Sequence, residues 1–230
     1  MAVWQDLVAI TVAYLLGCIA TAYYFVRLRT RQDIRQLGSG NVGGRNAGRV
    51  LGRSGFAIVA VGDALKGLLA VLFARYLDVG EWAMVLVILA VLAGHIWPAQ
   101  LGFKGGKGAA TFIGALAGYN LSIALLTAGV FVLLFVLLRS FTLAGYNVMI
   151  ALLIVGAFVL LFVFLRSFTL AGLLALVLAP MGTLLLGQPL VDFVAVAVPV
   201  LLVIFAHREN LRTKLQGRAQ PARPLTRRGE

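Results

Sequence analysis

Two glycine-rich segments hold the side chains best suited to chemistry. Residues 38–43 read GSGNVG and residues 102–108 read GFKGGKG. The first formally matches G-x-G-x-x-G. A dinucleotide site needs a strand before this motif, however, and here the motif follows an apolar run typical of a membrane helix. The second lacks the Walker spacing and has Gly108 where Ser or Thr would hold magnesium. Backbone N–H groups beside cationic side chains can instead surround a phosphate, whereas the simpler alternative is a pair of basic loops attracted to anionic lipid.

Three further polar groups interrupt apolar sequence. Asp63 and Lys66 are three residues apart, so on a helix they share a face and form either a structural ion pair or a site in which Lys66 meets phosphate. His207 and Asn210 have the same spacing, and His207 could act as a base or a phosphate ligand. His95 is more typical of a packing residue. The eight carboxylates are scattered singly, so we expect no bound divalent metal. We also expect no cofactor.

The elements that position these groups are apolar helices. Hydrophobic residues make up 61% of the chain, charged residues 12%, and the mean hydropathy is +0.99. These values exclude an ordinary water-soluble domain and indicate a polytopic all-α membrane protein. The single cysteine, Cys18, excludes an internal disulfide. We expect apolar helices over Leu7–Val26, Phe56–Phe73, Trp82–Trp97, Ala109–Leu138 with a break near residues 114–120, Phe168–Leu186 and Val191–Ala206.

Charge predicts which side each segment faces. Seven arginines and one aspartate between residues 27 and 53 give a local charge of +6, and the chain from residue 208 onward carries +5. Positive loops stay in the cytoplasm. We therefore expect an external N-terminus, cytoplasmic glycine loops and a basic cytoplasmic tail over 211–230. The net charge of +12 is too unevenly placed for a nucleic-acid surface, so no nucleic-acid partner is expected.

A tandem repeat complicates this topology. Residues 118–144 and 145–171 are two 27-residue copies that differ at six positions. One additional crossing would carry His207 and Asn210 to the face opposite Ser39 and Lys104. If these groups are to form one site, one copy fails to span, a neighbouring segment leaves the membrane, or the repeat is an error in the sequence, and we favour the first or the third.

Four segments together resemble one family. They are GSGNVGGRNAGR (38–49), GDALKG (62–67), GHIWPAQLGFKGGKGAAT (94–111) and HREN (207–210). In this order they are similar to the bacterial acyl-phosphate-dependent glycerol-3-phosphate acyltransferases, the PlsY family. The resemblance covers the whole chain apart from one repeat copy. It implies a single domain over 1–230, with a seven-helix family core plus one tandemly duplicated hydrophobic segment.

The resemblance also implies a reaction. A fatty acyl group would move from a long-chain acyl-phosphate to the 1-hydroxyl of glycerol 3-phosphate, giving lysophosphatidic acid and phosphate, in a bacterial inner membrane. Acyl-CoA and acyl carrier protein would not serve as donors. Membrane lipid would surround the helices, and a soluble enzyme that makes acyl-phosphate could dock on the basic tail.

Residue roles follow from the same resemblance. Ser39 and Arg49 would bind glycerol 3-phosphate, His207 and Asn210 would complete its pocket, and Lys104 would sit between the two phosphates. The acyl-phosphate would be cradled by a second set, namely Gly105, Gly106, Lys107 and Gly108. Further substrate contacts are expected from Asn41, Asn46, Lys66 and Arg45, the last adding a cation where many relatives have Thr. His207 would remove the hydroxyl proton itself or position a substrate phosphate that accepts it, and we favour the second.

Two other interpretations fit parts of the sequence. A duplicated family member that cannot assemble its site would be inactive. A small polytopic carrier could use the same basic loops to gather phosphorylated solutes, although the direct repeat and the motifs at one face are not typical of a carrier with inverted repeats.

Overall fold

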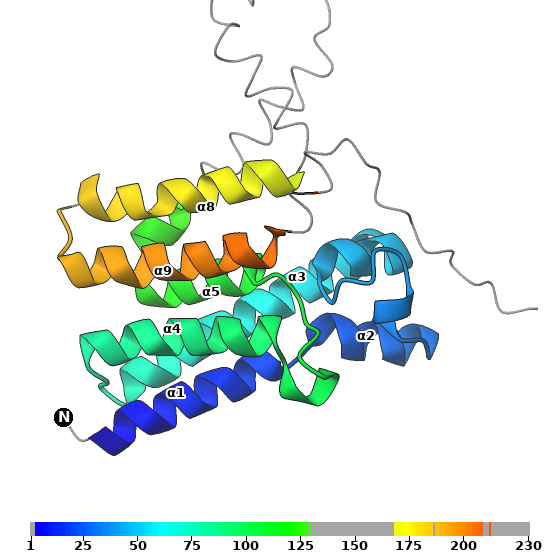
Figure 1. Cartoon of the computed structure of the whole chain (residues 1–230), viewed down its shortest axis with the longest axis horizontal. Coiled ribbons are helices and arrows are strands. Elements are labelled where there is room, and N and C mark those ends of the chain that lie inside the picture. The colour runs from blue at the N-terminus through cyan, green and yellow to red at the C-terminus, as the bar shows by residue number, and fades with distance from the viewer. Residues whose placement is uncertain (1–2, 128, 130–167, 186, 209–211, 213–230) are drawn as a thin grey trace, which may run out of the picture.

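The computed structural model describes residues 3–127, 129, 168–185, 187–208 and 212, which form helices and contain no strand. Figure 1 shows the long helices lying side by side as a bundle. The helices are α1 (Val3–Cys18), α2 (Thr21–Thr30), α3 (Gly44–Tyr76), α4 (Glu81–Ile96), α5 (Ala109–Tyr119), α8 (Phe168–Leu185) and α9 (Leu190–Ala206), with short 3₁₀ turns η1 (Ile34–Gln36) and η2 (Ala99–Leu101). The predicted all-α membrane fold is confirmed.

The first apolar segment is not one uninterrupted helix as the sequence predicts. It ends as α1 at Cys18 and restarts as α2 at Thr21. At this break the ammonium group of Lys66 donates to the carbonyl oxygens of Gly17 at 3.0 Å and Ile19 at 2.7 Å. Hydropathy does not reveal the interruption, because both halves are apolar and the compensating donor lies far away in the sequence.

Helix α3 begins twelve residues before the predicted span starts, at Gly44 rather than Phe56. Gly52 has non-helical dihedral angles, φ 73° and ψ −163°, and divides a short entrance segment from the long apolar part. The entrance segment carries Arg45 and Arg49, two of the arginines of the first basic region, which is why a hydropathy pattern alone excludes it from the span.

The predicted break after residue 114 is confirmed at Asn120. Helix α5 ends at Tyr119, Asn120 is extended, and its side chain accepts a hydrogen bond from the N–H of Ile123 at 3.2 Å as a new helical turn begins. Most of the repeat falls outside the described residues. How many times it crosses the membrane therefore stays a prediction.

Glycines bring the inner helices into close contact. A Cβ on Gly94 of α4 would lie 2.2 Å from the Tyr14 carbonyl of α1, and a Cβ on Gly114 of α5 would lie 1.9 Å from the Ala64 carbonyl of α3. Helices in lipid associate through such small-residue contacts, because apolar burial drives them little. Helix α4 is the central element, in contact with α1, α3, α5 and α9.

The outer faces suit a lipid environment. Three described segments are long and apolar enough to span a membrane, Val3–Thr30, Gly44–Tyr76 and Glu81–Leu101. Large apolar side chains on these faces are at least half exposed, for example Leu7 at 61%, Leu69 at 52% and Leu86 at 50%. Exposure of this kind fits hydrocarbon rather than water as the surrounding solvent.

Candidate functional site

The first glycine loop, residues 38–43, is fastened to α3 by Asn46. This side chain is fully buried, donates to the carbonyls of Ile34 at 3.2 Å and Leu37 at 2.9 Å, and accepts from the N–H of Ser39 at 2.9 Å. Gly38 has φ +55°, and a Cβ there would lie 2.3 Å from the Asn46 Oδ1 atom. Asn46 thus fixes the backbone that presents Ser39.

The second glycine loop, residues 102–108, folds back on the end of α4. The N–H groups of Gly105 and Gly106 donate to the carbonyls of Ile96 and His95, both at 3.0 Å. A Cβ on Gly105 would lie 2.1 Å from the His95 carbonyl oxygen. In this structure the missing side chains therefore permit close packing, and Gly108, with φ +81°, starts α5 directly afterwards.

Four buried polar side chains, from Asp63, Lys66, His95 and Thr111, form a cluster next to the second glycine loop. Lys66 Nζ is 3.1 Å from Asp63 Oδ1, which is 3.7 Å from His95 Nδ1, and that nitrogen is 3.2 Å from Thr111 Oγ1. Asp63, Lys66 and His95 are at most 6% exposed. Asp63 Oδ1 accepts no hydrogen bond of good geometry, so its contact with Lys66 is an ion pair by distance only. Lys66 therefore joins α3 to the α1 break, and His95 supports the second glycine loop.

Ser39 and Lys104 line one open cavity of about 420 Å³, although they are 65 positions apart. The cavity is also lined by residues that the sequence analysis did not single out as site residues: Asp33, Arg35, Gln36 and Gly40. In the sequence, Asp33 and Arg35 were counted only in the charge of residues 27–53. Their closeness to the GSG motif was an available signal, since the segment 33–40 forms one wall.

The other predicted polar site residues of the two glycine loops and of the start of α3 lie at the same end of the bundle. Arg45 and Arg49 lie in the first two turns of α3 and are exposed, and the Arg49 side chain passes 3.8 Å from the position of a Gly38 Cβ. Asn41 is half-buried in the first glycine loop, with its amide nitrogen 2.9 Å from the position of a Gly43 Cβ. Lys107 is half-buried in the second loop.

His207 follows α9 at this end of the bundle, where Val203 Cγ2 lies 3.6 Å from the position of a Gly108 Cβ. It is 8% exposed, and its Nδ1 is 2.9 Å from the Val203 carbonyl oxygen. Because that oxygen can only accept, Nδ1 carries the proton and Nε2 is unprotonated in the neutral ring. Burial, with Lys107 and Arg45 adding repulsion, lowers the pKa of His207 to about 4. Asn210 lies outside the described residues.

Helix α9 thus ends beside the second glycine loop, the arrangement the sequence analysis requires for a shared site. The structure brings Ser39 and Lys104 to one cavity and His207 into the field of Lys107 and Arg45. Lys66 and Asn46 are instead buried and bonded to backbone carbonyls. Among the described residues, no three His, Cys, Asp or Glu side chains are grouped as a metal site.

Comparison with known proteins gives a consistent answer. The family described as Glycerol-3-phosphate acyltransferase matches residues 7–154 and 141–217. The two matched stretches overlap at 141–154, within the repeat. Glycerol-3-phosphate acyltransferase 1 of Desulfitobacterium hafniense is 38% identical over 218 residues, which cover 95% of each chain. The enzyme of the same name from Bacillus cereus is 45% identical over 130 residues, covering 56% of this chain and 71% of the relative.

Solved structures agree with the sequence relatives. A crystal structure of PlsY (YgiH), an integral membrane glycerol 3-phosphate acyltransferase in its glycerol 3-phosphate form, is 31% identical, with a TM-score of 0.73 and 93% of each chain covered. Its lysophosphatidic acid form is 30% identical, with a TM-score of 0.72 and the same coverage. The chain therefore belongs to the glycerol-3-phosphate acyltransferase family and is an integral membrane acyltransferase.

Proposed function

We propose that this enzyme takes its acyl group from a long-chain acyl-phosphate and transfers it to the 1-hydroxyl of glycerol 3-phosphate. The observation that carries the proposal is the shared cavity, in which Ser39 and Lys104 meet from two glycine loops. An acyl-phosphate is a mixed anhydride and is already activated, so the protein has mainly to hold two anionic substrates together and stabilise developing charge. Cations and hydroxyl groups suffice for that.

Lys104 has a definable task in this scheme. Two phosphates at one site repel each other, and an ammonium group between them offsets the repulsion. The acceptor hydroxyl attacks the acyl carbonyl carbon, its proton leaves, and the carbon–oxygen bond to phosphate breaks. Ser39 and Arg49 would hold the acceptor. Lys107, with the positive end of α5, would meet the phosphate of the donor.

The state of His207 supports a substrate phosphate as the proton acceptor. With a pKa of about 4, His207 is neutral near pH 7 and a weak base. A phosphate monoester, whose second pKa is about 6, is the stronger base of the two. We propose that His207 Nε2 accepts a hydrogen bond that orients the acceptor, with Asn210 beside it.

The proposed setting is the bacterial inner membrane, with the N-terminus outside and the loops and tail in the cytoplasm. The charge of +6 between residues 27 and 53 supports this orientation. Glycerol 3-phosphate is soluble, so a cytoplasmic site gives it access. The basic tail remains a proposed contact for a soluble enzyme that makes the acyl-phosphate.

The test is lysophosphatidic acid formation by purified protein in lipid, with glycerol 3-phosphate and either palmitoyl-phosphate or palmitoyl-CoA. Turnover with the phosphate donor alone, lost in Lys104→Ala, is the expected result. Equal turnover with palmitoyl-CoA would refute the proposed donor. No turnover with either would refute the proposed reaction for this chain.

A further inference from the structure

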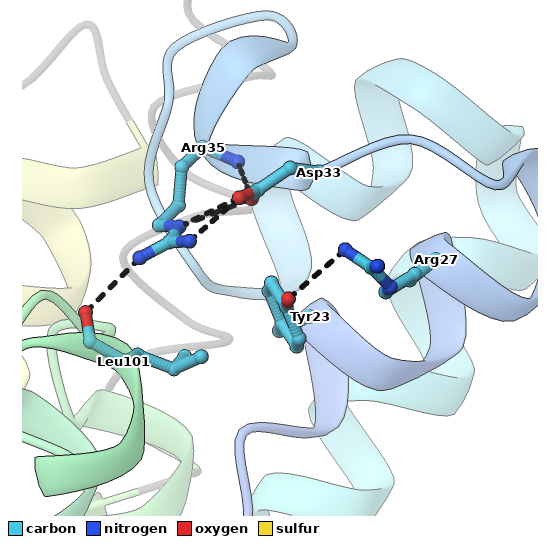
Figure 2. Close-up of polar contacts among 5 residues, drawn as sticks. All are labelled: Tyr23, Arg27, Asp33, Arg35 and Leu101. Carbon is cyan, nitrogen blue, oxygen red and sulfur yellow. Dashed lines mark hydrogen bonds and ion pairs between the residues drawn. The ribbon is translucent and has the colours of Figure 1, made fainter.

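Arg35 connects the two loop regions, as Figure 2 shows. Its Nε and Nη2 atoms contact the Asp33 carboxylate at 3.0 Å and 2.7 Å, while Nη1 donates to the carbonyl of Leu101 at 3.0 Å. The backbone N–H of Arg35 also donates to Asp33 Oδ1 at 2.9 Å, so the carboxylate caps η1 as well. We call this set of contacts the Arg35 bridge.

The bridge joins the two chain segments that carry Ser39 and Lys104. Arg35 is four residues before Ser39, and Leu101 is three residues before Lys104. Leu101 is 5% exposed and packs in one apolar cluster with Ile34 of η1. The apolar contact holds the two turns close together but does not fix their relative orientation. The guanidinium group does, because its N–H donors have a fixed planar geometry.

The charges of the cavity-lining residues indicate that Arg35 is not the cation that binds a phosphate here. Asp33 lines the same cavity, and a bare carboxylate would repel an anionic substrate. Arg35 donates to that carboxylate and holds the pKa of Asp33 below its usual range, so the pair is ionised and its net charge is zero. Of the cavity-lining residues, Lys104 supplies the remaining positive charge.

We infer that Arg35 is a positioning residue, which through Asp33 and the Leu101 carbonyl sets the separation of Ser39 and Lys104 across the cavity. This inference rests on the proposed function for its kinetic consequences. Its geometric content, a fixed relation between η1 and η2, is independent of any substrate.

Asp33→Asn gives the sharpest kinetic test, because the two roles of Arg35 predict opposite signs. If Arg35 binds phosphate directly, removing the neighbouring carboxylate releases the guanidinium and adds net positive charge, so the KM for glycerol 3-phosphate falls. If Arg35 positions the loops, the loss of its anchor lowers kcat and raises that KM. We expect a decrease in kcat/KM of about tenfold or more, as small displacements of reacting groups can produce.

Arg35→Lys keeps the charge but cannot contact both Asp33 and Leu101 with a fork. It should show a decrease similar to that of Asp33→Asn, and the double variant should be little worse than either, since both changes break one bridge. Arg27→Lys is the matched control. Arg27 also flanks the Tyr23 ring, with its central carbon 5.8 Å from the ring centroid against 5.4 Å for Arg35, but it does not line the cavity. Its activity should stay within about twofold of wild type.

Dipolar EPR provides a readout that needs no turnover. Spin labels on Gln36→Cys and Ala99→Cys, both exposed and placed in η1 and η2, should give a narrow distance distribution that broadens with Arg35→Lys and stays narrow with Arg27→Lys. An unchanged distribution in Arg35→Lys, or a lower KM in Asp33→Asn, would overturn the inference. A wild-type enzyme without turnover would refute the proposed function, while the EPR comparison would still decide whether the bridge positions the loops.

Discussion

Gly106→Ala tests how closely the second glycine loop must pack. A Cβ at this position would lie 2.1 Å from His95 Nε2 and 2.7 Å from the Val42 carbonyl oxygen. The imidazole ring cannot easily withdraw, because it is 6% exposed and its Nδ1 is held 3.2 Å from Thr111 Oγ1. The loop itself must therefore move away from α4.

The size of this movement follows from the contact distance. Real Cβ atoms essentially never approach closer than 3.0 Å, and 3.0 minus 2.1 leaves about 0.9 Å that the loop must gain. Lys104 and Lys107 flank the position and move with it. Misplacing catalytic groups by about 1 Å can cost about a hundredfold in rate, equivalent to about 2.7 kcal/mol of transition-state stabilisation. We expect kcat/KM to fall by about that factor.

Gly102→Ala is the matched control in the same loop. Nothing lies within 4 Å of a Cβ at Gly102, but its φ of +62° makes any side chain unfavourable by about 1 kcal/mol. This variant should lose some stability and keep most of its activity. The assay is the initial rate of lysophosphatidic acid formation, with thermal unfolding recorded on the same samples. Gly106→Ala with more than a third of wild-type kcat/KM, or equal impairment of both variants, would refute the reasoning.

Three further predictions concern buried polar groups. Asn46→Ala should lower the free energy of unfolding by roughly 3 kcal/mol, because it removes three buried side-chain hydrogen bonds to the loop backbone, and chemical denaturation measures this. Lys66→Met should cost about 3–5 kcal/mol by leaving Asp63 unpaired, and adding Asp63→Leu should restore part of it; no recovery would contradict the ion pair. Because the pKa of His207 is about 4 when folded and about 6.5 when unfolded, its contribution to stability is complete above pH 6.5 and decreases as pH falls toward 4. The melting temperature of His207→Gln should vary less with pH in that range than that of wild type.

The sequence alone determined the class of the protein and the region of its candidate site. Apolar runs long enough for a membrane, basic segments beside them and two glycine loops are local properties, and each can be recognised within a window of a few tens of residues. The start of α5 near residue 109 and the break at Asn120 were also predictable, since Gly108 and Asn120 favour helix boundaries. Lys104 belongs to the glycine and lysine segment, Ser39 was expected from the family resemblance, and both line one cavity.

Only the tertiary structure decided which partners the polar groups have. Lys66 was expected as an ion pair or a phosphate contact, but its ammonium group also caps the carbonyls at the end of α1. The N–H groups of Gly105 and Gly106 bond to the end of α4. Arg35 reaches a carbonyl 66 positions away. Local patterns cannot specify such pairs, because each depends on where helix packing places an unsatisfied backbone group, and that placement involves the whole bundle.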